Sequence, residues 1–376
     1  MTSQRDPALV VIQLSGGNDA LNTVVPYTNG IYQDSRKAIR LEEHEVHDLN
    51  GKLGLHPSMS PIKNLWDQGN VAIVNGIGYP KPNRSHFRSM DIWHTAESVD
   101  VAPDGWLGRT IREIDPEHQN VVAGVNFGRG LPRALHCKGV PVASVGNLAT
   151  YGLMPDIEDM ATRDLALDIF TRMYGPREGR DAILEAIGDT GMSAYLGADI
   201  LRAAPEQYRS SIEYGDNMIA QQIKDIAQVM FADVGTRVFY TQHGSYDTHS
   251  GELQNHATLW DELSNAVGDF FADLEEHGRE DDAVVMVFSE FGRRIDDNGS
   301  GTDHGSGGVA FVMGSNVKGG LYGDYPSLEP RDQVEGDMAY NNDFRGLYAT
   351  LLDDWMGIDP NPILGGNYEQ FDMIVR

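Results

Sequence analysis

Carboxylate, imidazole and hydroxyl side chains gather at four points of the sequence, each just after a short apolar run. A carboxylate and an imidazole together can bind a divalent metal or exchange a proton with a substrate. Mixed imidazole and carboxylate ligands suit zinc, manganese or iron, and a set without thiolates excludes the softest metal sites. The residues of these four groups are Asp19, then Ser85 and His86, then His243, Asp247 and His249, and last Glu290, Asp303 and His304.

The apolar runs that precede these groups predict the strands that must position them. Ala8–Leu14, 71–74, 237–241 and 284–288 are too short for helices, and several are rich in β-branched residues, as in strands buried on both faces of a parallel sheet. In open α/β sheets, ligands bind beyond the carboxyl ends of the strands. We therefore expect the four polar groups to meet in one crevice at that edge.

Predicted helices alternate with these strands, which indicates an α/β fold with a largely parallel, doubly wound sheet. A strong example is 252–277, where apolar residues recur at helical spacing. Helical patterns between about 155 and 235 predict a helical layer or lobe beside the sheet. We expect residues 1–376 to form a single domain.

Most of the candidate residues also have a purely structural explanation. Asp19 could be a turn residue, His243 a structural hydrogen-bond partner and Ser85 a helix cap. Arg293 could bind an anion or belong to a solvated pair with Arg294. The Asp247-x-His249 and Asp303-His304 pairs favour a site more strongly, since each lies in a glycine-flanked loop after a strand.

Composition excludes several kinds of partner. The formal net charge is −27, whereas nucleic acids and anionic membranes are bound through clustered Lys and Arg. No run of about 20 apolar residues is present, so we expect neither nucleic acid binding nor membrane insertion. The single cysteine, Cys137, rules out an intrachain disulfide. The compartment stays open: cytoplasmic as the chain stands, periplasmic if an export signal was removed.

Several segments resemble the bacterial DUF1501 family across nearly the whole chain. They include LSGGNDALNTVVP, VAIVNGIGYPKPNRSHF, HGSYDTHSGELQNH, VFSEFGRR and GTDHGSGGVAFVMGSNVKGGLYG. This family is similar to the alkaline phosphatase and sulfatase superfamily. Members of that superfamily fold as an α/β/α sandwich and usually hold two divalent metals near a nucleophilic hydroxyl or its equivalent. The resemblance therefore implies an alkaline phosphatase-like α/β/α sandwich.

The resemblance also implies roles for individual residues. Asp19 resembles the superfamily's first-strand metal aspartate, and Ser85 is the best match for its nucleophile. Asp247 and His249 lie where the superfamily has an aspartate and a histidine of one metal site, and His304 resembles the late histidine of that site.

One position departs from the superfamily pattern. Superfamily enzymes usually have Asp-His where this chain has Glu290-Phe291, so a second metal would lack a histidine. Oxygen ligands from Asp19, Glu290 and Ser85 could still hold magnesium, manganese or calcium, and Asp303 is an alternative ligand.

Alternatively, the site holds one metal, and hydroxyl activation comes from His86 or His243.

The implied activity is that of a metal-dependent hydrolase acting on a small anionic ester of phosphate or sulfate. Zinc or manganese is the first expectation, with magnesium or calcium as alternatives at a second site. Arg84 or Arg293 could steady the oxygens of the transferred group. The competing hypothesis is a divergent, non-catalytic member that keeps one metal for structure or ligand binding, and Phe291 favours it. The oligomeric state is not predicted.

Overall fold

Three buried parallel strands form the centre of the computed structural model, which describes residues 5–100, 102–152, 159–175 and 182–375. They are β1 (Ala8–Leu14), β8 (Val238–His243) and β9 (Ala283–Ser289). Strand β1 lies between the other two, and Leu14 pairs with both His243 and Ser289. The three strands therefore end side by side, and the residues that follow them begin at one edge of the sheet.

Within the described residues, the sheet has nine strands in the order β11-β5-β10-β9-β1-β8-β6-β7, with β12 paired to β5. Strand β10 runs antiparallel to both neighbours, whereas the other pairings are parallel. A loop without a crossover helix joins β9 to β10, and such a connection reverses the chain direction. The remaining strands are β5 (Val71–Gly78), β6 (Gly124–Phe127), β7 (Ala143–Val145), β10 (Gly308–Met313), β11 (Gly320–Tyr322) and β12 (Asn342–Asp343).

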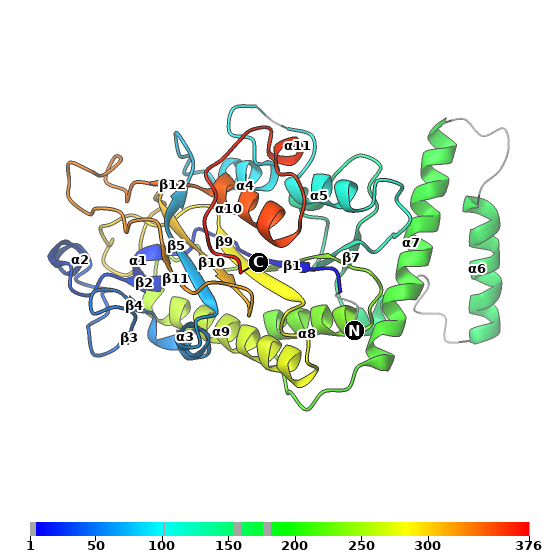
Figure 1. The fold of residues 1–376 in the computed structure, drawn as a ribbon, viewed down its shortest axis with the longest axis horizontal. Coiled ribbons are helices and arrows are strands. Elements are labelled where there is room, and N and C mark those ends of the chain that lie inside the picture. Colours follow the sequence, from blue (N-terminus) through cyan, green and yellow to red (C-terminus); the bar gives the residue numbers. More distant parts are fainter. Residues whose placement is uncertain (1–4, 101, 153–158, 176–181, 376) are drawn as a thin grey trace.

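Helices cover both faces of the sheet (Figure 1). One layer contains α3 (Ser60–Asp67), α8 (Met218–Phe231) and α9 (Glu252–Glu276). The other contains α4 (His86–Thr95), α5 (Trp106–Ile114), α10 (Phe344–Thr350) and α11 (Asn361–Leu364). Alternate residues of β1 belong to separate apolar cores, Val10 and Ile12 to one and Leu9 and Val11 to the other. The predicted α/β/α sandwich with a largely parallel sheet is confirmed.

Strand β5 is longer than the sequence pattern predicts. It continues from Val71 through Gly78, although the segment from 75 onwards has the composition of a turn. Gly76 has a φ of +56°, and an added Cβ there would lie 2.1 Å from the Asn341 side chain. Glycine at position 76 thus allows the strand to continue where the Asn341 side chain packs against it. Strand β5 therefore ends at the same edge of the sheet as β9.

The predicted helical region near 155–235 has two parts in the structure. Helices α6 (Met160–Tyr174) and α7 (Ala182–Gln207) stand beyond the β7 edge of the sheet, whereas α8 belongs to a covering layer (Figure 1). Parts of the region, 153–158 and 176–181, lie outside the described residues. Within the described residues, no helix is long and apolar enough to cross a membrane.

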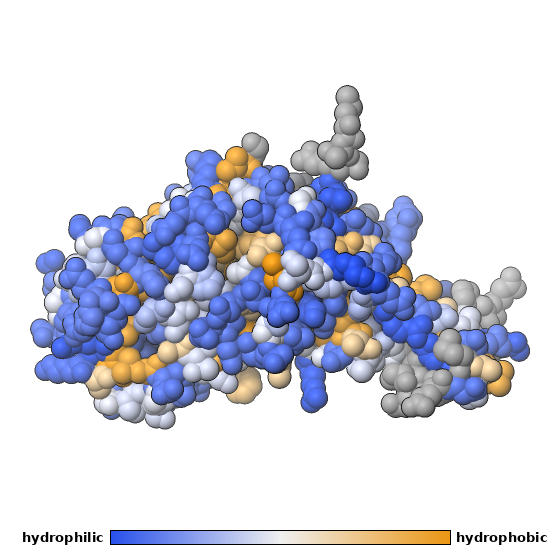
Figure 2. Space-filling view, turned by 90° about the horizontal axis from the view of Figure 1, so that it is seen from below, coloured by the Kyte–Doolittle hydropathy of each residue, from blue (hydrophilic) through white to orange (hydrophobic). Residues whose placement is uncertain are grey.

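The segment between β1 and β5 forms a small second sheet near the same edge. It contains α1 (Ala20–Thr23), β2 (Val24–Val25), α2 (Gly30–Ser35), β3 (His47–Asp48) and β4 (Gly54–Leu55), with the strand order β2-β4-β3. The surface in Figure 2 is mostly hydrophilic, with apolar residues in small separate patches, in keeping with the acidic composition.

Candidate metal centre

The loop after β8 carries Asp247 and is fastened to the turn after β1. The Tyr246 N–H donates to the Ser15 carbonyl over 3.1 Å. A Cβ added to Gly16, whose φ is +123°, would lie 2.4 Å from the Asp247 nitrogen. Glycine at position 16 therefore allows this close approach, which holds the Asp247 backbone against the end of β1.

Arg293 joins three loops of the site from inside. Its guanidinium is buried and donates to the carbonyls of Gly17 (2.7 Å), Thr302 (2.9 Å) and Tyr246 (3.0 Å). It also donates to Asp247 Oδ1 over 2.6 Å. Burial alone would raise the pKa of Asp247, but the Arg293 hydrogen bond and charge outweigh it and lower that pKa. The N–H groups of Arg293 thus bind three loops and Asp247. They do not point to a substrate, contrary to one expectation from the sequence.

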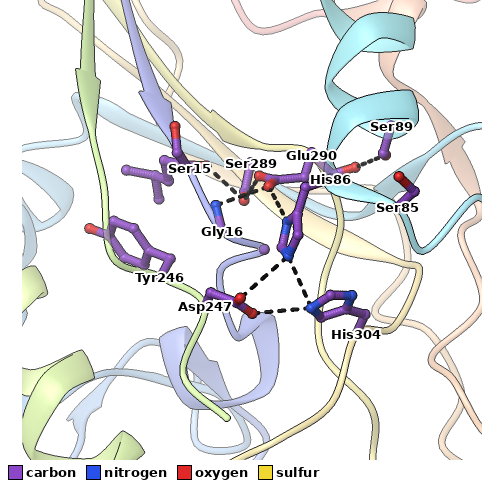
Figure 3. Close-up of polar contacts among 12 residues, drawn as sticks. Ser15, Gly16, Ser85, His86, Ser89, Tyr246, Asp247, Ser289, Glu290 and His304 are labelled. Carbon is purple, nitrogen blue, oxygen red and sulfur yellow. Dashed lines mark hydrogen bonds and ion pairs between the residues drawn. The ribbon is translucent and has the colours of Figure 1, made fainter.

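His86 is the first residue of α4 and approaches the site from the helix. Its Nδ1 lies 2.8 Å from Oε1 of the buried Glu290. Glu290 also accepts from the Gly16 N–H (2.9 Å) and the Ser289 hydroxyl (2.9 Å). The Glu290 hydrogen bond raises the pKa of His86. Glu290 therefore orients an imidazole and does not itself reach the centre of the site (Figure 3).

Four side chains meet in front of these supports. His304 Nε2 lies 3.0 Å from both His86 Nε2 and His249 Nε2, and 3.1 Å from Asp247 Oδ1. Asp247 also lies 3.1 Å from His249 Nε2 and 3.5 Å from His86 Nε2. Figure 3 shows His86 and His304 pointing toward one another and toward the Asp247 carboxylate. We call these four residues the His/Asp cluster.

The supports of the three rings fix which nitrogens carry hydrogen. The Nδ1 atoms of His86, His249 and His304 face Glu290 Oε1, Asp303 Oδ1 and the Arg84 carbonyl at 2.8, 3.0 and 2.8 Å. These oxygens can only accept, so each Nδ1 of a neutral ring donates and each Nε2 presents a lone pair. When all three rings are neutral, three lone pairs and a carboxylate therefore face one another, and no hydrogen bond accounts for their short separations.

Such an arrangement fits a divalent metal. Ligand atoms about 2.0–2.1 Å from a tetrahedral zinc ion are about 3.3 Å apart, close to the separations within the His/Asp cluster. Histidine ligands commonly donate their second nitrogen to a carboxylate or carbonyl, as all three do here. Among the described residues, His86, Asp247 and His304 form the group whose ligand atoms all lie within 4.8 Å of one another, and His249 contacts two of them.

Asp19 does not join the cluster. It is fully buried, and its carboxylate is paired with the equally buried Arg36, with 2.9 Å between Oδ1 and Nη2. The Leu21 N–H also donates to it at the start of α1. Arg36 comes from the irregular segment after α2. The expected metal contact of Asp19 is thus replaced by an internal ion pair.

Three other candidates occupy supporting or separate positions. Arg84 Nη2 pairs with Asp337 at 2.6 Å, so its role toward His304 is through its carbonyl. Asp303 contacts His249 Nδ1 and is an orienting group. His243 contacts Tyr246 and Glu262, at 3.1 and 3.3 Å.

Ser85 is exposed at the start of α4, where its side chain caps no N–H. Figure 3 shows its hydroxyl pointing away from the cluster, on the far side of His86. The neighbouring His86, expected as a candidate base, is the residue of this segment that enters the cluster.

Phe291 fills the position where the superfamily pattern has a histidine. Its ring is buried, with centroids 5.0 Å from the His86 ring and 5.1 Å from the His304 ring. A Cβ on Gly17 would lie 2.3 Å from it. Of the ligands expected for a second metal, Asp19 is paired with Arg36 and Glu290 is engaged with His86, so the described residues offer one cluster.

A pocket of about 580 Å³ opens beside the cluster. It is bordered by His86, Asp247 and Glu290 and by residues that sequence reasoning missed: Gln13, Ser15, Gly16, Phe87, Met90, Asp91, His94 and Arg133. Polar Gln13 inside the otherwise apolar run Ala8–Leu14 is the signal that could have indicated this pocket. Arg133 has no such signal, since it reaches the pocket from the short 3₁₀ helix Arg133–Leu135, far along the chain from β1.

Comparisons with solved structures find distant likenesses. A protein in the alkaline phosphatase superfamily from Vibrio parahaemolyticus has 11% identity and a TM-score of 0.42, covering 97% of this chain and 70% of that one. The PsFucS1 sulfatase from Pseudoalteromonas sp. has 12% identity and a TM-score of 0.43, covering 98% and 71%. The zinc complex of the C-terminal periplasmic domain of EcEptC from Escherichia coli has 9% identity and a TM-score of 0.39, covering 84% and 75%. At these identities and TM-scores, the likeness says nothing about substrate or activity.

No curated protein matches this chain in sequence. The sequence model of one family matches residues 6–370, nearly the full chain. The cluster, the Glu290-Phe291 pair and the loops that Arg293 joins all fall within that range. The chain therefore belongs to the DUF1501 family, described as a protein of unknown function.

Proposed function

We propose that this protein is a metal-dependent hydrolase of a phosphate or sulfate ester, with one divalent metal bound by His86, Asp247, His249 and His304. The observation that carries the proposal is the convergence of three Nε2 lone pairs and a carboxylate at 3.0–3.5 Å. Imidazole-rich ligand sets suit zinc or manganese. A metal bound there would supply a Lewis acid that polarises an ester oxygen and lowers the pKa of a nearby water.

Charge supports a divalent ion at this place. Asp247, Glu290 and Asp303 bring three carboxylates to the cluster and its supports, and Arg293 brings one guanidinium. Two negative charges are left for a bound cation to neutralise. Arg293 lowers the pKa of Asp247, which favours the ionised carboxylate. An ionised carboxylate is the form that binds a metal.

The chain's own residues prepare the site for a substrate. Glu290 and Arg293 hold His86 and Asp247 in place, so the ligand atoms need no rearrangement. The pocket beside His86 has an apolar wall of Phe87 and Met90. Phe87 is 91% exposed, which is unusual for a large apolar side chain. It would contact the organic part of the ester.

A guanidinium also borders the pocket. Arg133 pairs with Asp91 from α4, and both line the cavity. Of Arg84, Arg133 and Arg293, Arg133 is the one that lines this pocket, so it would attract an anionic ester to this face even though it pairs with Asp91. The strongly negative net charge favours small anionic substrates held by a local positive group over large polyanions.

A non-catalytic metal-binding protein is the second candidate. The buried Phe291 ring favours it, because the ring occupies the position of an expected second-site ligand. The exposed position of Ser85 favours it as well, since no nucleophilic hydroxyl from that segment faces the cluster.

The experiment strips the protein of metal, reloads it with Zn²⁺ or Mn²⁺, and measures hydrolysis of 4-nitrophenyl phosphate, bis(4-nitrophenyl) phosphate and 4-nitrophenyl sulfate. We expect about one metal per chain and turnover of at least one ester, both lost in Asp247→Ala. His44→Ala, at an exposed histidine outside the cluster, is the matched control. A tightly bound metal without turnover of any ester would favour the second candidate.

A further inference from the structure

The pocket beside the His/Asp cluster has a polar floor made by Gln13 and Ser15. Gln13 is the penultimate residue of β1, and Ser15 follows the last residue of that strand. Both border the cavity that His86 and Asp247 also border. Neither has a role in the proposed metal centre.

The floor is oriented by two buried side chains beneath it. Gln13 Oε1 accepts from His94 Nε2 over 2.7 Å and from the Tyr240 hydroxyl. Burial lowers the pKa of His94 to about 4, so its ring is neutral and donates through one nitrogen. With its oxygen engaged twice, the Gln13 amide must turn its NH₂ group the other way. That group donates to Ser15 Oγ over 2.7 Å.

The consequence concerns the Ser15 hydroxyl. Its oxygen receives a hydrogen bond from an amide, which cannot take up a proton, so Gln13 cannot activate Ser15 as a nucleophile. Within the described residues, the Ser15 side chain makes no other hydrogen bond. The hydroxyl proton is therefore available to the pocket.

The backbone of Ser15 is held between two parts of the cluster. Its carbonyl accepts from the Tyr246 N–H, next to Asp247. The following residue, Gly16, donates its N–H to Glu290 Oε1, which in turn contacts His86 Nδ1. Figure 3 shows Ser15 and Gly16 at the end of β1 beside Glu290. The hydroxyl is thus fixed relative to the proposed ligands.

We propose that Ser15 is a substrate-binding residue that donates a hydrogen bond to an oxygen of the tetrahedral phosphate or sulfate group, and that Gln13, held by His94 and Tyr240, is its positioning residue. The inference rests on the proposed function, since it names the part of the substrate that lies against β1. It also separates the roles of two serines: Ser15 faces the pocket, whereas Ser85 does not.

The test measures binding and not only turnover. Zinc-loaded protein is titrated with inorganic phosphate and with inorganic sulfate in a calorimeter, and zinc content is measured on the same samples. A hydrogen bond to a charged group is worth about 1.5–3 kcal/mol, or roughly tenfold to a hundredfold in affinity. We expect Ser15→Ala to lose about that much affinity for the preferred anion at unchanged zinc content.

Two further variants separate binding from structure. Ser15→Thr keeps the hydroxyl and should restore most of the affinity. Gln13→Met removes the orienting amide at similar size and should weaken anion binding by less than Ser15→Ala does. Ser60→Ala, at an exposed serine of α3 outside the pocket, is the matched control and should bind like the wild type.

The outcomes distinguish this inference from the proposed function. Equal anion affinity in Ser15→Ala and wild type would overturn the role of Ser15 and leave the metal-dependent hydrolase standing. A zinc-loaded wild type that binds neither anion would overturn both. A protein that takes up no zinc, yet binds an anion in a Ser15-dependent way, would overturn the metal centre and support Ser15.

Discussion

Asp19 and Asp247 follow adjacent strands at the same edge of the sheet, yet their surroundings differ completely. Asp19 is 0% exposed and paired with Arg36. The Asp247 side chain is 47% exposed and faces three imidazoles as well as Arg293. In the first region, the chain supplies its own cation. In the second, one guanidinium meets more negative charge and lone pairs than it can balance.

The charges of the buried group around Asp19 balance. Burial beside Asp19 raises the pKa of Glu252, so this neighbour is protonated, and one carboxylate faces one guanidinium. Arg36 also donates to the carbonyls of Ile295 (3.0 Å) and Arg294 (2.7 Å), in the loop after β9. The comparison teaches that a carboxylate at a strand end is available to a cation only where the rest of the chain leaves its charge unbalanced.

The largest difference should appear in metal content. We expect His304→Ala to reduce the metal retained after dialysis from about one per chain to near zero, because it removes the residue that contacts the other three members of the His/Asp cluster. Asp19→Asn should retain about one metal, since its carboxylate faces Arg36. Elemental analysis of dialysed protein measures both, with His44→Ala as control. If folded Asp19→Asn also lost its metal, Asp19 would contribute to metal binding, and the proposed difference between the two regions would be wrong.

Stability should show the reverse order. Asp19→Ala leaves Arg36 buried without its partner, which costs about 3–5 kcal/mol in the free energy of unfolding. Burial alone would raise the pKa of Asp19, but Arg36 outweighs it and lowers that pKa. The contribution of the pair is therefore present above the usual carboxyl pKa and lost as the pH falls below it. Urea unfolding at several pH values measures this.

The double variant Asp19→Leu, Arg36→Met is the control for that stability change. It removes both charges, so it should recover much of the loss. An equal loss in the double variant would show that packing, and not the unpaired charge, is responsible.

The supports of the imidazoles should matter in proportion to their burial. Glu290 is buried, whereas the Asp303 side chain is exposed. Loss of an orienting group typically lowers metal affinity by about 10- to 100-fold. We expect Glu290→Gln to fall in that range and Asp303→Asn to change zinc affinity less, as measured by competition with a chelator. The reverse order would mean that His249, and not His86, dominates binding.

The smallest effect concerns Asp225, a half-buried carboxylate without a strong cation partner. Burial raises the pKa of Asp225 on α8 to about 6. The folded state therefore holds its proton more tightly than the unfolded state, and stability falls as the pH rises from about 4 to about 6. Asp225→Asn removes this cost and keeps an acceptor for the Leu148 N–H.

We expect the Asp225→Asn variant to be more stable than the wild type by about 1–2 kcal/mol at pH 8, after allowance for partial exposure. The gain should disappear below pH 4. Thermal or urea unfolding at both pH values measures it. A gain that is the same at pH 4 and pH 8 would show that ionisation of Asp225 is not its cause.

The sequence by itself predicts much of the site because strands and their ends have local signals. Apolar runs such as Ala8–Leu14 predict strands, and the glycine-flanked Asp247-x-His249 and Asp303-His304 pairs lie at the edge where the sequence expects a site. The departure at Glu290-Phe291 is visible in the sequence too. The fold class is confirmed, whereas the roles of the individual site residues stay predictions.

Only the tertiary structure decided which charges are balanced and which are not. Arg36 reaches Asp19 from a segment without a regular period, so no pattern near Asp19 could indicate that pair. The rotation of α4 after the extended β5 turns His86 inward and Ser85 outward, and neighbouring residues on a helix point in different directions. Strand ends follow from neighbours in the chain, whereas side-chain partners depend on tertiary contacts, between residues 17 positions apart for Asp19 and Arg36 and 204 positions apart for His86 and Glu290.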